Sequence, residues 1–180
     1  MSWKLAAAAA TLRDQVNTRY PRRDRSSDGT IGDQAHKARG KLSDHNPDRT
    51  GYVMALDLDE DGWPAHQFAD QLIEYMRTSG DKRIKNVVYE GRVASGTYSD
   101  QRWVWRSAPS LGHAHHIHIS FAEPAKHDGA PFPLAVLDLP KVGLRKSDNN
   151  PPTSSSAVQA TVTPAKKTAK KATKKATPKP

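Results

Sequence analysis

Apolar residues recur at helical spacing in two stretches of the chain. The first predicted helix has a capping residue at Ser2 and ends near Arg19. Its apolar stripe consists of Leu5, Ala9, Leu12 and Val16. The second predicted helix has Pro64 in its first turn and Gly80 at its C-terminal cap. Its stripe consists of Phe68, Leu72, Tyr75 and Met76.

Other segments alternate or are rich in β-branched and aromatic residues, which predicts strands. These predicted strands are 53–58, 84–89, 102–106 and 116–121. In 116–121, Ile117 and Ile119 point to one face, so His116 and His118 point to the other. Strands that cluster after helices predict an α+β domain, with an antiparallel sheet packed against helices.

The polar segment 22–52 is predicted to be a long loop, and loops of this length in a domain are usually functional or disordered. Trp103 and Trp105 alternate with Val104 in a predicted strand, a pattern typical of core or of a groove wall. His66 and His127 are predicted to lie at the surface.

Composition divides the chain into a domain at 1–144 and a tail at 145–180 that is rich in Lys, Ala and Pro. The tail holds nine Lys or Arg and one acid, which accounts for most of the net charge of +9. With almost no apolar bulk, it is predicted to be disordered. Its charge can attract anionic wall polymers, lipid headgroups or nucleic acid, whereas the domain is nearly neutral.

The 180 residues include no cysteine, which excludes a disulfide framework and a thiolate metal site. No stretch approaches the roughly 18 apolar residues of a membrane span, and the alanine-rich start is interpreted as a helix, not a signal peptide. Because the chain has no cysteine, any metal must be held by histidine and carboxylate.

Two segments about sixty residues apart carry such ligands. Ser43-Asp44-His45 is followed by Ala55-Leu56-Asp57, and the later segment is His113-Ala114-His115-His116-Ile117-His118. Together they can supply His, Asp and His to one ion. An open zinc site needs three protein ligands and a free position for water, and this ligand set suits it.

Further segments extend the pattern, namely Trp3-Lys4-Leu5, Leu12-Arg13-Asp14-Gln15-Val16-Asn17, Ser27-Asp28-Gly29-Thr30-Ile31-Gly32-Asp33, Ser43-Asp44-His45-Asn46-Pro47, Arg83-Ile84-Lys85 and His116-Ile117-His118-Ile119-Ser120. Together with the metal-type residues, they resemble the M15-like zinc peptidases of the Hedgehog/DD-peptidase fold, over residues 3–121. These enzymes cleave peptidoglycan stem peptides or their cross-links, and many similar proteins are phage endolysins or lysin modules.

The resemblance implies Zn²⁺ bound by His45, Asp57 and His118. It makes His116 the general base and His113 a second active-site imidazole. A base beside a zinc-bound water can take its proton and pass it to the leaving amine. His113 or Arg39 would stabilise the oxyanion or bind a substrate carboxylate.

One departure from the family pattern concerns spacing. The family motif has His and Asp seven residues apart with a Gly between, whereas His45 and Asp57 are twelve apart, with residues 46–50 inserted before Gly51. Asp59, on the same strand face, remains an alternative to Asp57. His115 remains an alternative to His113, and His36 in Asp33-Gln34-Ala35-His36 is a further site candidate.

The sequence thus predicts a zinc metallopeptidase acting on peptidoglycan peptide, expected to be a monomer. It would be made in the host cytoplasm without a signal peptide and would act at the cell wall, released during lysis or carried in a virion. Two alternatives remain. A metal-dependent nuclease is suggested by Asp44-His45-Asn46, the later histidines and the basic tail. The other is a non-catalytic wall-binding or virion protein.

Overall fold

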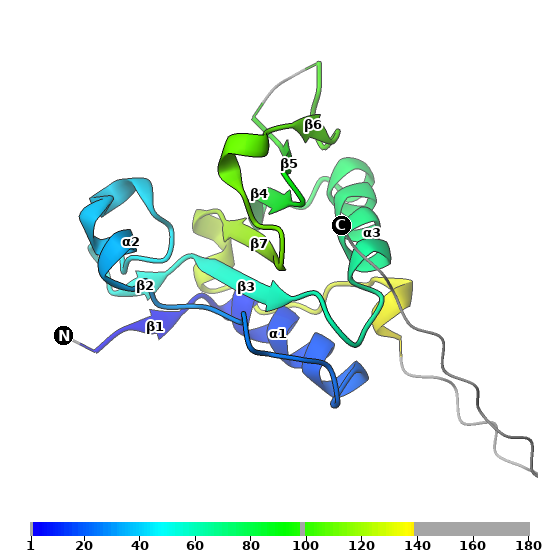
Figure 1. Cartoon of the computed structure of the whole chain (residues 1–180), viewed down its shortest axis with the longest axis horizontal. Helices are drawn as coiled ribbons and strands as arrows, with labels where there is room; N and C mark the ends of the chain where they lie inside the picture. The colour runs from blue at the N-terminus through cyan, green and yellow to red at the C-terminus, as the bar shows by residue number, and fades with distance from the viewer. Residues whose placement is uncertain (1, 98–99, 139–180) are drawn as a thin grey trace, which may run out of the picture. The chain divides into compact units, whose positions relative to one another are not determined.

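The computed structural model describes residues 2–97 and 100–138, and the predicted tail at 145–180 lies outside them. Its main feature is a five-stranded antiparallel sheet in the order β3-β7-β4-β5-β6 (Figure 1). The strands are β3 (Ala55–Asp59), β4 (Ile84–Tyr89), β5 (Arg92–Ser95), β6 (Arg106–Ser107) and β7 (His116–Phe121). A separate parallel pair joins β1 (Lys4–Leu5) to β2 (Tyr52–Val53). The α+β class and the antiparallel sheet predicted from the sequence are confirmed.

The other regular elements of the described structure are helices. They are α1 (Ala7–Arg19), α2 (Gln34–Ala38) and α3 (Ala65–Ser79), with short 3-10 helices η1 (Gly40–Leu42), η2 (Pro109–Leu111), η3 (Glu123–Lys126) and η4 (Ala135–Leu137). Helix α3 ends at Gly80 in the left-handed conformation (φ +72°), as predicted. Among the described residues, no helix combines the length and apolar character needed to cross a membrane.

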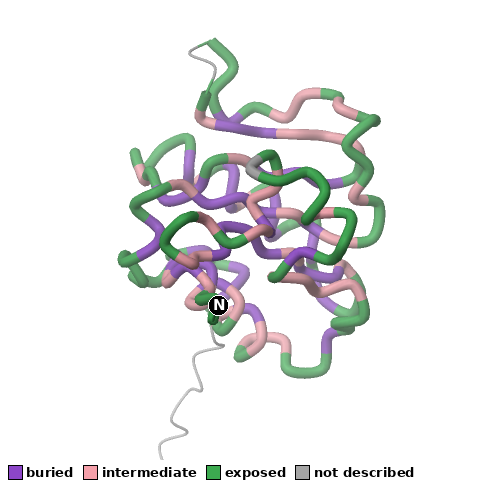
Figure 2. Tube along the Cα trace, turned by 90° about the vertical axis from the view of Figure 1, so that its left-hand side faces the viewer, coloured by how far each residue is buried: buried purple, intermediate pink, exposed green. Residues whose placement is uncertain are grey.

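One face of the sheet is apolar and packs against α1 and α3. Alternation along β3 and β7 directs Leu58 and Ile119 to this face, where they meet Leu12 of α1 and Phe68 of α3. Buried residues accordingly lie in the interior of the domain, and exposed residues lie in its outer turns and loops (Figure 2). Because both long helices take the same face, the opposite face of β3 and β7 is left for polar side chains.

The first helix begins later than its apolar stripe predicts. It starts at Ala7, and the preceding Lys4–Leu5 forms a strand instead. The Lys4 N–H donates to the Gly51 carbonyl at 2.9 Å, and the Ala6 N–H donates to the Val53 carbonyl at 3.1 Å. Pairing with a distant strand therefore overrides the local helical pattern.

The predicted strand at 102–106 is wrong, because only Arg106–Ser107 pairs with the sheet. Trp103 lies in a turn with a φ of +55°, and its N–H donates to the Ser95 carbonyl at 2.9 Å. Its side chain is buried in the core, and it also lines a shallow recess beside Gly96 and Arg102. The Trp105 Nε1–H donates to Asp70 of α3.

Two further differences concern regular structure that the sequence pattern did not predict. Strand β5 follows a tight turn in which Glu90 and Gly91 both have positive φ angles, the geometry of a two-residue hairpin. The segment 22–52 is not simply a loop, since it contains α2, η1 and the start of β2. Most of that segment still lacks sheet or helix, so its position depends on side-chain anchors.

Phe68 tests the packing of α3 on the sheet. Its side chain is fully buried, 5.1 Å from the Trp63 ring between centroids. Phe68→Ala should therefore lower the free energy of unfolding by about 3–5 kcal/mol. Urea denaturation at fixed zinc concentration measures this change. The half-exposed Val104 provides the control, since Val104→Ala should change the value by less than about 0.5 kcal/mol.

Candidate metal centre

The sheet register brings the two predicted metal motifs together. Asp57 of β3 lies directly opposite His118 of β7, and both point to the face that the helices leave uncovered. His45 reaches the same point from the segment after η1, which is tied to the sheet by a hydrogen bond from the Met54 N–H to the Asp44 carbonyl at 2.9 Å. Three residues from separate segments of the chain thus form one cluster.

The donor atoms of this cluster are close enough to share one ion. His118 Nδ1 lies 2.8 Å from Asp57 Oδ1, His45 Nε2 lies 3.2 Å from Asp57 Oδ2, and the two ring nitrogens are 3.2 Å apart. Tetrahedral zinc with bonds near 2.0–2.1 Å separates its ligand atoms by roughly 3.3 Å. The side chains are only 5%, 14% and 13% exposed for His45, Asp57 and His118. The cluster therefore fits zinc after a small expansion.

Each histidine of the cluster is oriented by a hydrogen bond from its other ring nitrogen. His45 Nδ1 lies 2.6 Å from the Thr30 carbonyl, which can only accept, so that nitrogen carries the proton. His118 Nε2 lies 3.0 Å from the Ser120 hydroxyl. This leaves His45 Nε2 and His118 Nδ1 to face Asp57. Such partners commonly orient metal-binding imidazoles.

The electrostatics of the cluster keep Asp57 ionised. Burial alone would raise the pKa of Asp57, but hydrogen bonds and charge from His118 and His45 outweigh it and hold the pKa well below its usual range. Burial likewise disfavours a charged His45, yet the hydrogen bond and charge of Asp57 prevail and raise the pKa of His45. A negative centre between two imidazoles is an arrangement that attracts a cation.

Two more histidines border the cluster on the β7 side. His116 Nε2 lies 3.8 Å from Asp57 Oδ1, and the His113 ring lies 4.9 Å from the His116 ring and 5.0 Å from the His118 ring between centroids. Burial lowers the pKa of His116, although the charge of Asp57 opposes this effect. Burial, with the neighbouring His118 and His116, lowers the pKa of His113 to about 4. Both rings are therefore neutral near pH 7.

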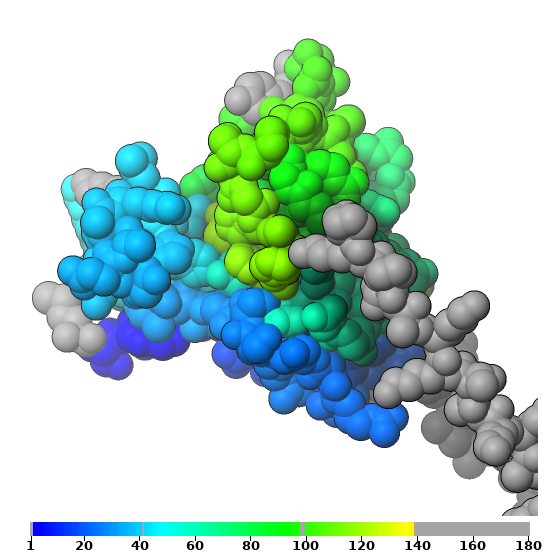
Figure 3. Space-filling view, viewed as in Figure 1, coloured from blue at the N-terminus to red at the C-terminus, as the bar shows by residue number. Residues whose placement is uncertain are grey.

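A recess of about 280 Å³ opens over the cluster. Its lining residues come from the segment around α2 and η1 on one side and from β4, β5, η2 and β7 on the other, and include His36, Arg39, Leu42, His45, Lys85, Leu111, His113 and His118. In the space-filling view these two groups of segments form separate lobes with a recess between them (Figure 3). The predicted substrate residue Arg39 thus lines the same recess as two of the candidate metal ligands, His45 and His118.

Asp59, the alternative ligand, is occupied elsewhere. Its Oδ2 accepts hydrogen bonds from the Ser27 N–H at 2.9 Å and the Ser27 hydroxyl at 2.7 Å, and its Oδ1 accepts from the Asp61 N–H at 2.9 Å. These bonds lower the pKa of Asp59 to about 2 against the opposing effect of burial. The structure therefore groups Asp57, and not Asp59, with His45 and His118.

The remaining histidines fall into two groups. His115 is exposed, and His66 and His127 are at the surface as predicted. His36 lies closer, with its ring 4.9 Å from the His45 ring between centroids. The sequence reasoning missed Thr30 and Ser120 as orienting partners. Ser120 carried a usable signal, because it follows His118 by two residues on the same strand face.

Two other groups of ligand-type side chains occur among the described residues. One comprises Glu60, His66 and Glu90, and the other comprises Asp24, Asp59 and Asp61. Each has two exposed members, whereas the His45 cluster has none. The His45 cluster is thus the better candidate for a tightly held ion.

No family model, no curated protein and no solved structure matches the chain.

Zinc binding at this cluster should depend on pH through His45. A proton on His45 competes with the metal, so zinc affinity should fall as pH drops through the raised pKa, by about tenfold per pH unit for one displaced proton. The free energy of unfolding of the metal-free protein should show the opposite dependence on pH. Its stabilisation by protonated His45 is complete below the ordinary pKa of 6.5 and is lost as pH rises through the raised value.

Chelator competition and urea denaturation between about pH 5 and 9 measure these two curves. His66→Gln serves as the control, because exposed His66 lies outside the cluster and should leave both curves unchanged. Zinc affinity that stays flat across this range would contradict binding through His45.

Proposed function

We propose that the chain is a zinc-dependent peptidase that hydrolyses peptide bonds in peptidoglycan stem peptides or their cross-links, of the M15-like type found in phage endolysins and lysin modules. The observation that carries the proposal is the cluster of His45, Asp57 and His118, of which His45 and His118 line an open recess. It coincides with the residues that the sequence resemblance assigns to zinc. Zinc held there would supply a bound water of lowered pKa and would polarise the scissile carbonyl.

His116 is suited to the role of general base. Its lowered pKa leaves the imidazole neutral near pH 7, able to accept the proton of the attacking water. Asp57 lies 3.8 Å from His116 Nε2 and would stabilise the imidazolium that forms. His116 then donates this proton to the nitrogen of the leaving amine.

His113 and Arg39 supply polar groups along the recess. Because the pKa of His113 is about 4, its ring is uncharged and offers one N–H donor to a developing oxyanion. Arg39 is exposed on the recess wall, where its guanidinium can bind a substrate carboxylate. The exposed Leu42 and Leu111 line the same recess and provide apolar contacts for small aliphatic side chains.

The test uses the purified full chain, zinc and isolated peptidoglycan. The proposal predicts about one zinc per chain and the release of new amino groups, with activity lost on chelation and restored by zinc. Zinc binding without amine release from walls of several cross-link types would contradict a peptidase and favour a wall-binding role. Cleavage of plasmid DNA that survives deletion of residues 147–180 would instead support a nuclease.

A further inference from the structure

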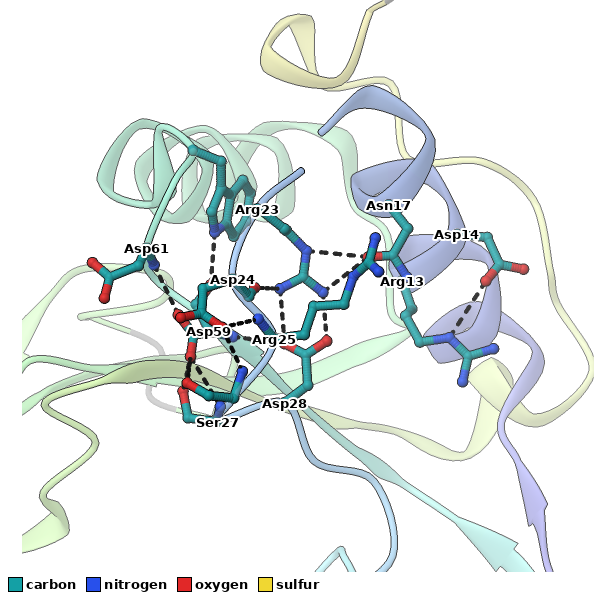
Figure 4. Close-up of polar contacts among 12 residues, drawn as sticks. Arg13, Asp14, Asn17, Arg23, Asp24, Arg25, Ser27, Asp28, Asp59 and Asp61 are labelled. Atoms are coloured by element: carbon teal, nitrogen blue, oxygen red, sulfur yellow. Dashed lines mark hydrogen bonds and ion pairs between the residues drawn. The ribbon is translucent and has the colours of Figure 1, made fainter. Parts of the chain in front are cut away.

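Arg23 is a buried arginine outside the candidate metal cluster. Its side chain is fully buried in the segment that follows α1. Nε and Nη2 donate to Asn17 Oδ1 of α1 at 3.1 and 2.9 Å, and Nη1 donates to the Asp24 carbonyl at 2.8 Å. Nη1 and Nη2 also donate to the two carboxylate oxygens of Asp28 at 2.8 and 2.5 Å (Figure 4). Every nitrogen of the guanidinium thus holds a partner.

Asp28 connects this arginine to strand β3. Besides binding Arg23, its Oδ1 accepts a hydrogen bond from the Asp59 N–H at 2.8 Å (Figure 4). The next residue, Gly29, pairs with Asp57 through two backbone hydrogen bonds of 3.1 and 2.8 Å. A methyl group on Gly29 would lie 2.8 Å from Asp57 Oδ2, so this backbone packs directly against the candidate metal-binding carboxylate.

The residue after Gly29 orients the second ligand. The Thr30 carbonyl accepts the Nδ1 proton of His45 at 2.6 Å and so determines which ring nitrogen faces Asp57. Three consecutive residues therefore link Arg23 to two of the three candidate ligands. The segment 22–33 has no helix and only the isolated bridge at Gly29, so hydrogen bonds hold it in position. Ser26 and Ser27 bond to Asp59, and the Asp24 N–H donates to the Asp61 carbonyl. Arg23 is the anchor that acts directly on Asp28, the residue next to Gly29.

We propose that Arg23, through Asp28, is a positioning residue for the metal centre. It holds the Asp28–Thr30 segment in place, and that segment aligns His45 and Asp57 before the ion binds. A bidentate arginine–carboxylate pair fixes direction as well as distance, which a lysine cannot reproduce. The proposal rests on the proposed function only in requiring that the cluster bind zinc, and it is tested by zinc affinity, which does not depend on peptidase turnover.

The test compares two buried arginines in the full chain. Arg23→Lys should weaken zinc binding by about 10- to 100-fold, the usual effect of disturbing residues that orient metal ligands. Arg83 provides the matched control. It is also buried, and its guanidinium donates to both carboxylate oxygens of Asp81. The guanidinium carbon lies 4.0 Å from the centroid of the Phe132 ring. Among the interactions of the described residues, none joins Arg83 to the segment 23–30. Arg83→Lys should lower the thermal midpoint while zinc affinity stays within about twofold.

Zinc affinity is measured by chelator competition at a temperature where circular dichroism shows each variant folded. If Arg23→Lys does not fold, Asn17→Ala decides the question, since it removes one acceptor of Arg23 and leaves the Asp28 pair in place. Its zinc affinity should fall by severalfold. Wild-type affinity in folded Arg23→Lys or Asn17→Ala would overturn the proposal and leave Arg23 a purely structural residue.

The two proposals fail in different ways. A wild-type chain that binds zinc but releases no amines contradicts the peptidase, while the Arg23 and Arg83 variants still decide the positioning role. A wild-type chain that binds no zinc contradicts both.

Discussion

Replacing His118 by alanine should remove both zinc and peptidase activity. The substitution deletes the Nδ1 atom that lies 2.8 Å from Asp57 and 3.2 Å from His45, leaving two of the three candidate ligands. Loss of the several kcal/mol that a bound metal contributes to the transition state corresponds to roughly a thousandfold drop in turnover or more. Zinc content by atomic absorption and amine release from peptidoglycan, measured on the same preparation, test this result.

His115 offers a control within the same segment. Its side chain is exposed. In the described part of the chain its backbone carbonyl accepts from the Ser27 hydroxyl at 2.8 Å and from the Glu60 N–H at 3.4 Å. His115→Ala should therefore retain zinc and turnover within about twofold of the wild type. Full zinc occupancy in folded His118→Ala would contradict the assignment of the ligands.

His116→Gln should separate catalysis from metal binding. The substitution removes the group that accepts the water proton but leaves His45, Asp57 and His118 in place, so zinc should stay bound while turnover falls by roughly 10²- to 10⁴-fold. The acidic limb of the pH–rate profile should also change, because the group that must be deprotonated is gone. Steady-state amine release at several pH values, together with zinc content, measures both effects.

The matching variant His113→Gln tests whether the role of general base belongs to His116 alone. If His113 only supplies an N–H donor, His113→Gln keeps a donor in that place and should reduce turnover less than His116→Gln does. The reverse order would exchange the roles proposed for these two histidines. Loss of zinc in His116→Gln would show that His116 contributes to the metal site itself.

Local pattern predicted the parts of the fold in which neighbouring residues determine the structure. Alternation at 116–121 placed Ile117 and Ile119 in the core and His118 on the opposite face, and Gly80 ended α3 as expected. The pattern failed where a distant partner decides. Lys4–Leu5 is extended because it pairs with β2, and Trp103 leaves the strand because its N–H bonds to Ser95.

The sequence predicted which residues form the candidate site but not how they are arranged. His45, Asp57 and His118 were predicted as ligands, and the structure brings them together, while zinc itself stays a prediction. The choice of Asp57 over Asp59 was not possible from alternation, because residues two apart in a strand share one face. It depends on Ser27, whose hydroxyl and N–H engage Asp59 and come from a segment 30 or so residues earlier.

The hydrogen bond between His45 and the Thr30 carbonyl bears on how far the spacing between His45 and Asp57 can vary between sequences. His45 takes its orientation from Thr30 and its location from the bond between the Met54 N–H and the Asp44 carbonyl. Asn46 belongs to the same framework, because its side-chain amide donates to the His36 and Gly40 carbonyls. Residues 47–50 make none of these bonds and turn outside the cluster. Within that turn Asp48 accepts its own local hydrogen bonds from Thr50. The turn is itself anchored by Asp48, which pairs with Lys126 at 2.6 Å, but its tip at Arg49 and Thr50 is exposed. The twelve-residue separation of His45 and Asp57 is thus set in a surface turn, and insertions at that tip should be tolerated. A search for such sites that requires a fixed spacing between the first two ligands would overlook chains built in this way.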